Sequence, residues 1–373
     1  MTLPTPALAL PTQPHSSSPH AEAQRAPSAP RGERRLLPVL HERPAERNAP
    51  SPRSVRLSVT DRCDFACTYC RPSRSDGYAS ERLDLGAWKV LVSGLLTAGV
   101  RRFRLTGGEP LVHPEVVRIV SAVVEVAAAA GLEREIDLAM TTNASQLARL
   151  AKPLAEAGLR RINVSIDTLD EQRFRAITRG GELAPVLAGI DAALEAGLTP
   201  LKLNTVVLRG VNDDELEGLV RFAWARGMVP RFLEVMPIAE GAQLARSHLV
   251  TVAEMRASLA HLLQPDPAVA EPDRGPAKYV RARGASERVG FISGTSDTYC
   301  GSCDRLRVSS TGTLRPCLAT DDGVESAAAL AAASTAGVAD LVGEAWLLKP
   351  DGRTFKGCTE SSAAHVSMRA IGG

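Results

Sequence analysis

The chain has 373 residues, enough for one large α/β domain with an appendage or for two ordinary domains. Hydrophobic residues make up 44% of it and charged residues 23%, so a sizeable core can be buried. The net charge of only +2 excludes a protein that binds nucleic acid mainly through a basic surface.

Residues 1–53 differ in composition from the rest of the chain. They hold eleven of the 25 prolines and no Phe, Trp or Tyr. Such a segment buries too little apolar surface to offset the entropy that is lost on ordering. We therefore predict a disordered, Pro-rich extension over 1–53, a first domain over 54–236 and a C-terminal region over 237–373.

From Ser54 onward, short β-branched runs alternate with helical patterns. The predicted strands are residues 55–60, 103–106, 136–141, 161–166, 201–208 and 230–235. The predicted helices between them are residues 85–98, 114–130, 146–157, 183–196 and 213–225. This alternation predicts a parallel sheet of βα units, which is either an open relative of the TIM barrel or a doubly wound sheet. The longest apolar stretch, 116–130, is interrupted by Arg118 and Glu125 and indicates an amphipathic helix rather than a membrane span.

Polar and unusual residues gather at the carboxyl ends of the predicted strands, at 60–70, 106–110, 141–143, 165–167 and 236–237. In a βα barrel these ends converge on one mouth, where the active site lies. The pattern therefore favours an α/β fold of the partial (βα)6 TIM type. We expect residues 237–373 to pack against the open side of this barrel and to contain a helix near 252–263 and an Ala-rich helix near 324–336.

Three cysteines follow the first predicted strand in the pattern Cys63-x3-Cys67-x2-Cys70. Three thiolates hold three irons of a four-iron cluster and leave the fourth iron open, because such clusters usually take four protein ligands. A structural zinc site also needs four ligands, so zinc would require a distant partner. A disulfide would leave one cysteine over. The close spacing, with no secretory signal before it, favours a cluster in a reducing cytoplasm.

This first triad, with Tyr69 directly before its last cysteine, resembles the signature of the radical S-adenosylmethionine enzymes. The resemblance implies that the open iron binds S-adenosylmethionine and that electron transfer releases a 5′-deoxyadenosyl radical. It implies cofactor contacts by Tyr69, by Gly108 within the Gly-Gly-Glu-Pro segment 107–110, by Ser165 and by Met236. The partial (βα)6 barrel of that family agrees with the six strands predicted above.

A second triad lies in the C-terminal region, in the pattern Cys300-x2-Cys303-x13-Cys317. It also lacks a fourth ligand, so it predicts a second cluster with an open iron that could bind substrate; half of a zinc ribbon is the alternative. Arg305 and Arg307 follow at once, and their side chains would point the same way if this segment is extended. Paired guanidinium groups suit phosphate oxygens.

The second triad, the arginine pair and a chain that ends in Gly372-Gly373 resemble the GTP 3′,8-cyclases of molybdenum cofactor biosynthesis, over residues 55–373. The resemblance implies an enzyme that converts GTP to (8S)-3′,8-cyclo-7,8-dihydroguanosine 5′-triphosphate with two [4Fe–4S] clusters and S-adenosylmethionine. It implies that the radical takes hydrogen from ribose C3′, that the second cluster binds guanine, and that Gly372 and Gly373 take part in catalysis. The implied GTP contacts are Arg56, Arg104, Thr141, Lys202, Arg305 and Arg307.

For partners, we expect a reductant such as flavodoxin or ferredoxin, a downstream enzyme that forms cyclic pyranopterin, no nucleic acid or membrane, and possible homodimers. Two alternatives stay open: another radical S-adenosylmethionine enzyme with an auxiliary cluster, such as a peptide-modifying enzyme, and a zinc-stabilised binding protein. Ala144 departs from the glycine that the family commonly has after Thr-Thr-Asn. Cys358 belongs to neither triad, and we expect it to be a free thiol.

Overall fold

This computed structural model describes residues 51–70, 78–79, 82–238, 241–265, 275–297, 299–350 and 368. All of these residues belong to one compact unit, residues 44–373. The Pro-rich extension predicted over 1–53 lies outside the described residues except for its last three. Cys358, Gly372 and Gly373 lie outside them too.

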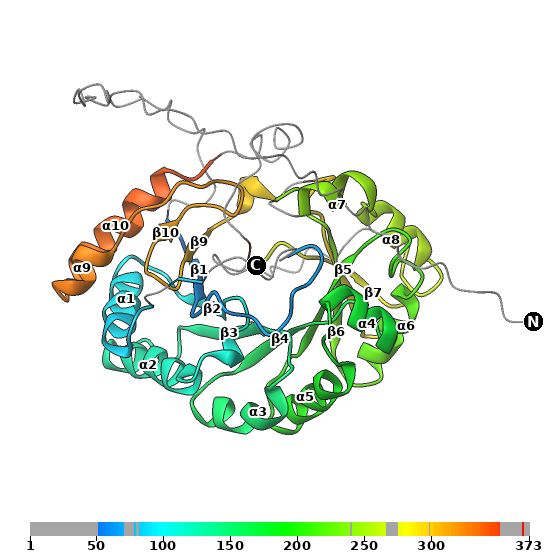
Figure 1. The fold of residues 1–373 in the computed structure, drawn as a ribbon, viewed down its shortest axis with the longest axis horizontal. Helices are drawn as coiled ribbons and strands as arrows, with labels where there is room; N and C mark the ends of the chain where they lie inside the picture. The colour runs from blue at the N-terminus through cyan, green and yellow to red at the C-terminus, as the bar shows by residue number, and fades with distance from the viewer. Residues whose placement is uncertain are drawn as a thin grey trace, which may run out of the picture. The chain divides into compact units, whose positions relative to one another are not determined.

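Six parallel strands form the centre of the sheet. They are β1 (Ser54–Ser58), β2 (Arg102–Thr106), β3 (Asp137–Thr142), β4 (Arg161–Ser165), β5 (Lys202–Val207) and β6 (Val229–Glu234). Each strand pairs with the next in chain order, and in Figure 1 the strands curve around a centre with helices outside them. The predicted α/β class and parallel sheet are confirmed, and the curvature is consistent with a partial barrel.

The predicted helices follow these strands. They are α1 (Leu85–Thr97), α2 (Val116–Ala129), α3 (Leu147–Glu156), α5 (Leu183–Glu195) and α6 (Leu216–Trp224). Their buried side chains form one continuous core with those of the strands. Among the residues that the structure describes, no helix is both long and apolar enough to cross a membrane.

One helix within residues 54–236 was not predicted. The sequence of α4 (Glu171–Thr178) is mostly polar, and the helix buries Phe174, Ile177 and Thr178. It begins at Asp170, whose side chain accepts a hydrogen bond from the amide of Arg173 at 2.8 Å. With so few apolar residues, the segment lacks the periodicity that reveals a helix in a sequence.

Four further strands come from residues 237–373 and extend the sheet at both edges. They are β7 (Lys278–Arg281), β8 (Arg288–Ile292), β9 (Arg305–Val308) and β10 (Leu314–Arg315). The sheet order is β10-β9-β1-β2-β3-β4-β5-β6-β8-β7, with β9 parallel to β1 and β8 parallel to β6. The C-terminal region thus joins the sheet through main-chain hydrogen bonds. Its strands have only two to five residues, too few for a clear pattern.

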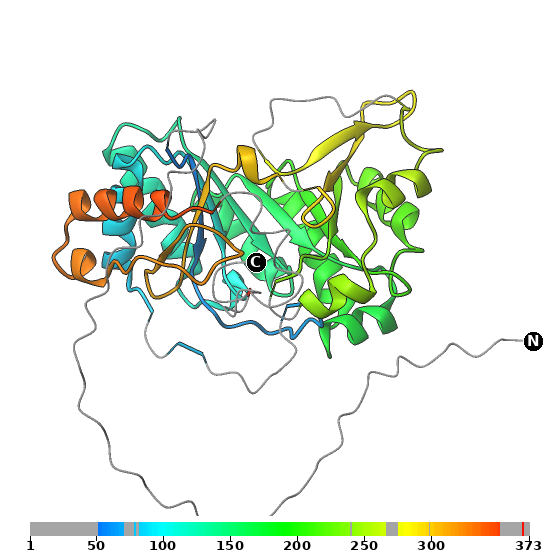
Figure 2. The same ribbon diagram turned by 90° about the horizontal axis from the view of Figure 1, so that it is seen from above.

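The C-terminal helices lie on two sides of the sheet. Figures 1 and 2 show α7 (Gly241–Ser247) and α8 (Val252–Ser258) on the opposite side from α9 (Ala327–Ala331) and α10 (Thr335–Leu347). The helix predicted near 252–263 is α8, which ends at Ser258 and is followed by turns.

The single Ala-rich helix predicted near 324–336 is wrong. The chain breaks between α9 and α10 at Ala333, which has a positive φ of 48°, and Ser334 caps α10 by accepting from the amide of Gly337. The high helix propensity of alanine concealed this break, because the capping serine was a weak signal within an alanine run.

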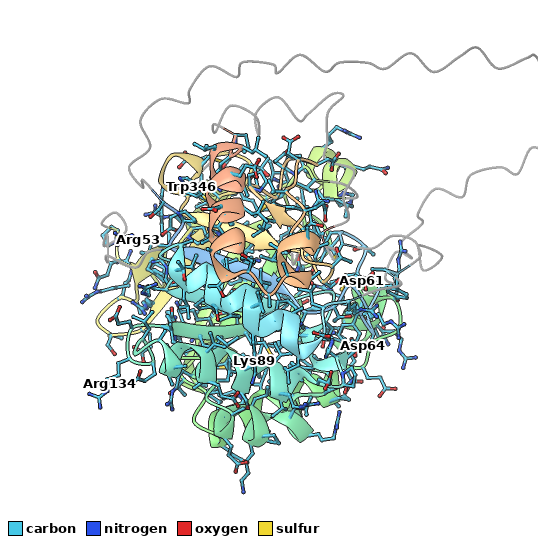
Figure 3. The ribbon with its side chains drawn as sticks, turned by 90° about the vertical axis from the view of Figure 1, so that its left-hand side faces the viewer. Arg53, Asp61, Asp64, Lys89, Arg134 and Trp346 are labelled. Carbon is cyan, nitrogen blue, oxygen red and sulfur yellow. The ribbon has the colours of Figure 1, made fainter. Side chains whose placement is uncertain are left out.

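Helix α10 packs closely on α1, as Figures 1 and 3 show. Gly94 permits this contact, because a Cβ there would lie 2.5 Å from Cβ of Val338 and 2.9 Å from the carbonyl oxygen of Thr335. We therefore expect Gly94→Ala to lower the free energy of unfolding by about 1–3 kcal/mol, as overpacking usually does. Denaturant unfolding measures the change.

The matched control is Gly218 in α6, because a Cβ at this position would meet no atom within 4 Å. Gly218→Ala should raise the free energy of unfolding by up to ~1 kcal/mol through helix propensity alone. Equal effects of the two substitutions would show that the contact between α1 and α10 is not tight.

Candidate functional site

The first cysteine triad lies on the loop that follows β1. Phe65 in this loop packs edge-on against Phe174 of α4, with ring centroids 5.7 Å apart. The amides of Ala66 and Thr68 donate to the carbonyl oxygens of Thr178 (3.1 Å) and Ile177 (3.0 Å) at the end of the same helix. Helix α4, which the sequence pattern did not reveal, therefore holds the loop in place.

The three thiols of this loop lie close to one another. Burial, followed by the charges of Glu109 and Asp64 and by the thiol of Cys70, raises the pKa of Cys63. Burial, then Asp167 and the thiols of Cys70 and Cys63, raises the pKa of Cys67. The six described cysteines form no disulfide. Three neighbouring thiols can hold three irons of a four-iron cluster and leave the fourth iron open.

Gly107 and Gly108 allow the loop after β2 to approach the loop after β1. The amide of Gly108 donates to the carbonyl oxygen of Thr60 at 2.7 Å, and the amide of Glu109 donates to that of Arg62 at 2.8 Å. A Cβ on Gly107 would lie 2.5 Å from the Thr60 carbonyl oxygen, and one on Gly108 would overlap that of Arg62. The glycine pair thus has a structural reason within the protein, while the cofactor contact of Gly108 stays a prediction.

Glu109 connects the carboxyl ends of β2 and β3. Its carboxylate is buried and accepts hydrogen bonds from the amides of Leu111 (2.9 Å) and Asn143 (2.6 Å) and from the hydroxyl of Thr142 (2.6 Å). Burial raises the pKa of Glu109 to about 8, and these hydrogen bonds offset only part of the effect. In the sequence, Glu109 stands out only as part of the Gly-Gly-Glu-Pro segment, and nothing there indicates that its carboxylate joins the ends of β2 and β3.

Tyr69 is held by Asp167, which lies just beyond the end of β4. The hydroxyl of Tyr69 donates to the Asp167 carboxylate at 2.7 Å, and the amide of Val206 donates to its second oxygen at 2.8 Å. Burial raises the pKa of Asp167 to about 6. Ser165 lies at the end of β4, so the structure brings Tyr69 and Ser165 to the same end of the sheet.

Met236 follows β6, where Glu234 fixes the surrounding loops. The buried carboxylate of Glu234 accepts hydrogen bonds from the amides of Val252 (2.8 Å), Thr295 (2.9 Å) and Ser296 (2.8 Å) and from the hydroxyl of Ser296. It thereby joins the end of β6 to the segment that leads to Cys300. Glu234 was not predicted, because a single glutamate gives no signal in the sequence.

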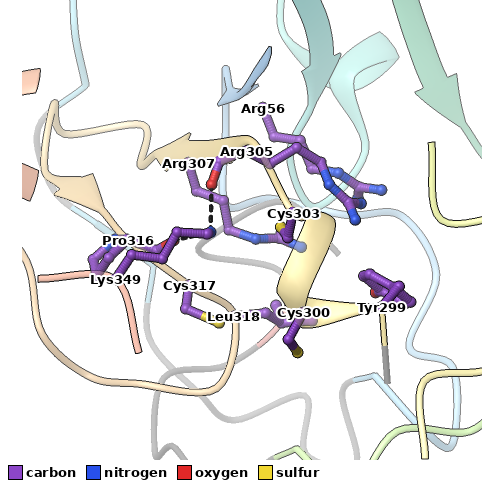
Figure 4. A pocket seen from close by; sticks show the side chains of 10 residues that line it. All are labelled: Arg56, Tyr299, Cys300, Cys303, Arg305, Arg307, Pro316, Cys317, Leu318 and Lys349. Atoms are coloured by element: carbon purple, nitrogen blue, oxygen red, sulfur yellow. Dashed lines mark hydrogen bonds between the residues drawn. The ribbon is translucent and has the colours of Figure 1, made fainter. Parts of the chain in front are cut away.

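The second triad surrounds a separate pocket. Cys300 lies in the 3-10 helix η2 (Cys300–Ser302), Cys303 comes directly before Asp304 and β9, and Cys317 follows β10. Figure 4 shows the three sulfur atoms around one space. The residues that line the pocket are Arg56, Tyr299, Cys300, Cys303, Arg305, Arg307, Pro316, Cys317, Leu318 and Lys349.

Three of the predicted GTP-binding arginines lie at one level of the sheet. Arg56 on β1 is in register with Arg104 on β2 and with Arg307 on β9. Burial, followed by the charges of Arg307, Arg305 and Arg104, lowers the pKa of Arg56. Burial likewise lowers the pKa values of Arg104 and Arg307 to about 10. Arg307 is buried and Arg56 and Arg104 are half-buried, so concentrating these cations is unfavourable unless an anion compensates them.

Arg56 and Arg104 line a cavity of about 350 Å³. Its lining includes four of the predicted GTP-binding residues, which are Arg56, Arg104, Lys202 and Arg305. Arg307 lines the neighbouring pocket around the second triad instead. Thr141 lines neither cavity, although its hydroxyl accepts a hydrogen bond at 3.1 Å from Asn163, which does line the large one.

Further basic residues of this cavity were missed. Arg231 lies inside the otherwise apolar strand β6 and is buried. A charge within an otherwise apolar strand is a signal in the sequence that could have indicated Arg231. Arg102 and Arg161 line the cavity too, and each is paired with an acid, Asp304 and Asp137 respectively.

A third cavity, of about 100 Å³, connects the two ends of the site. It is lined by Tyr69 and Met236 beside the first triad and by Tyr299, Arg305 and Arg307 beside the second. The structure therefore brings residues of both predicted groups to the lining of one cavity. Within the described part of the chain, no three Cys, His, Asp or Glu side chains are grouped as they would be around a single metal ion.

Two family models match consecutive parts of the chain. Residues 57–223 match the radical SAM superfamily, and residues 228–355 match the molybdenum cofactor synthesis C-terminal family. The two matches meet between residues 223 and 228.

Two relatives that match over most of their length are both named GTP 3′,8-cyclase. The GTP 3′,8-cyclase of Pelotomaculum thermopropionicum is 42% identical over 303 residues, which are 80% of this chain and 91% of that protein. GTP 3′,8-cyclase 1 of Pseudomonas aeruginosa is 43% identical over 317 residues, which are 82% of this chain and 92% of that protein.

A solved structure shares the fold. Streptococcus suis SuiB bound to S-adenosylmethionine is 15% identical, with a TM-score of 0.57 over 83% of this chain and 68% of that one. This likeness concerns the fold, whereas the identities above 40% to relatives of matching length concern the family. The chain belongs to the GTP 3′,8-cyclase family and, through residues 57–223, to the radical SAM superfamily.

Proposed function

We propose that the chain cyclises GTP to (8S)-3′,8-cyclo-7,8-dihydroguanosine 5′-triphosphate, the first step of molybdenum cofactor biosynthesis. One observation supports the proposal: two triads of cysteines without disulfides lie in a fold whose three cavities share lining residues, one beside Tyr69 of the first triad's loop and one around the second triad, and these cavities are lined by buried and half-buried cations. The first cluster and S-adenosylmethionine, when bound, supply a 5′-deoxyadenosyl radical. The protein's own residues bind and orient the nucleotide and keep water from it.

Residues 54–236 are proposed to form the radical domain. Cys63, Cys67 and Cys70 would hold its cluster, since their thiols are close together on a loop that α4 and the Gly107-Gly108 segment fix from two sides. The proposed cofactor contacts are Tyr69, Gly108, Ser165 and Met236. Two of these, Tyr69 and Met236, line the cavity that leads to the second triad, which supports their assignment.

Residues 237–373 are proposed to form the substrate-binding region. Cys300, Cys303 and Cys317 would hold a cluster whose open iron takes the guanine base. The triphosphate would lie among the cations of the large cavity, because an anion of about four charges relieves their mutual repulsion. The proposed contacts are Arg56, Arg104, Lys202, Arg231, Arg305 and Arg307, with Thr141 acting through Asn163.

The terminal Gly372 and Gly373 are proposed to act in the chemical step. This assignment follows from the family alone, and both positions lie outside the described residues. The reaction also needs electrons from outside the chain. We therefore propose a reductant such as flavodoxin or ferredoxin and a downstream enzyme that converts the product to cyclic pyranopterin.

Anaerobic turnover tests the proposal. Reconstituted protein, reduced and incubated with GTP and S-adenosylmethionine, should form 5′-deoxyadenosine together with a cyclised nucleotide. Near eight irons per chain are expected, as two four-iron clusters require. Zinc in place of iron, or cleavage of S-adenosylmethionine without any change to GTP, would refute it.

A further inference from the structure

Lys349 lies beside the second cysteine triad. It follows the end of α10 and is only 4% exposed. Its Nζ donates hydrogen bonds to the carbonyl oxygens of Arg305 at 2.7 Å and Pro316 at 2.8 Å. Arg305 comes two residues after Cys303, and Pro316 comes directly before Cys317. Figure 4 shows the lysine spanning these two segments.

The ammonium group of Lys349 lies directly beside a cysteine of the second triad. Removing an ammonium from water is costly unless an opposite charge compensates it. Besides the two carbonyl oxygens, its neighbours include the ring of Trp346, 5.4 Å from Nζ, and the thiol of Cys303, with which it interacts. Lys349 lines the same pocket as Cys300, Cys303 and Cys317. Thiolates bound to a cluster would supply the charge.

We propose that Lys349 is a positioning residue whose positive charge raises the reduction potential of the second cluster. The inference rests on the proposed function, because it requires that cluster. The potential of an iron–sulfur cluster responds to net charge, hydrogen bonds and solvent exposure. Reduction adds one negative charge, so a nearby fixed cation stabilises the reduced cluster relative to the oxidised one.

Three substitutions separate charge from packing. Lys349→Gln keeps two N–H donors for the two carbonyl oxygens and removes the charge. Lys349→Arg keeps the charge. The control is Lys89→Gln on the outer side of α1, where the lysine is exposed and pairs with Glu125 at 2.9 Å.

The measurement is an EPR-monitored redox titration of the full chain with all three cysteines of the first triad replaced by Ala, so that one cluster titrates. At a fixed potential, Lys349→Gln should lower the ratio of reduced to oxidised cluster about tenfold, a shift of about 59 mV for one electron. Lys349→Arg and Lys89→Gln should remain close to the parent.

Each outcome decides the proposal. An unchanged potential in Lys349→Gln at full iron content overturns it, and so do equal shifts in the Gln and Arg variants, because charge is then not the cause. If the cluster is lost in the Gln variant alone, the charge is needed for assembly, which supports it. Loss in both variants shows a purely structural lysine and overturns it. If the parent itself holds no second cluster, the proposed function fails instead.

Discussion

Replacing Cys63, Cys67 or Cys70 by Ala should reduce 5′-deoxyadenosine formation to background. A four-iron cluster with one open iron has no protein ligand to spare, so the loss of one thiolate removes the site that binds the cofactor. About four irons per chain should remain, because the second triad is separate. Iron analysis and anaerobic assay of 5′-deoxyadenosine measure both effects.

Cys358→Ala is the matched control for these variants. This cysteine belongs to neither triad, so its replacement should leave the iron content and the rate unchanged. A Cys67→Ala variant that formed 5′-deoxyadenosine at the parent rate would show that the first triad does not hold the cluster.

GTP binding should weaken strongly when neighbouring cations of the sheet are removed. Arg56→Ala or Arg307→Ala should each cost roughly 1.5–3 kcal/mol, or about tenfold to a hundredfold in Kd, as the loss of a charge-assisted contact does. The double variant should lose less than the sum, because removing one cation relieves the desolvated neighbour with which it is in register. Equilibrium dialysis with GTP measures the change.

Two controls tie this effect to the triphosphate. Arg118 is exposed on α2 and pairs with Glu115, so Arg118→Ala should leave the Kd unchanged. Binding of GMP should also suffer less than binding of GTP in the Arg56 and Arg307 variants, since it carries fewer charges. GTP affinity at the parent level in the double variant would contradict the assignment of both residues.

The local sequence pattern was sufficient to predict the part of the fold that contains strands β1–β6. Strands β1–β6 and their helices alternate regularly, and glycines such as Gly99 and Gly158 mark helix ends with a positive φ. Strands β7–β10 were not predicted, because their short sequences become strands only by pairing with distant segments. Residues 305–308 are an example. The two arginines suggested a ligand site, but nothing in the local sequence indicated that this segment forms a strand that pairs with β1.

The residues of the site also differ in whether the sequence alone reveals them. The cysteines and the Gly107-Gly108 pair are dense local motifs, so the sequence alone revealed them. Glu109, Asp167, Glu234 and Lys349 are single charged residues whose meaning comes from burial and from partners far away in the chain. Their roles could be recognised only once those partners were known.

Transfer of deuterium from the ribose of GTP tests the central claim most directly. GTP labelled with deuterium at C3′ is incubated anaerobically with the reduced, reconstituted protein and S-adenosylmethionine, and the 5′-deoxyadenosine is analysed by mass spectrometry. The account predicts that 5′-deoxyadenosine gains one deuterium while the cyclised nucleotide loses it. Unlabelled 5′-deoxyadenosine, with all of the deuterium retained in GTP, would contradict it.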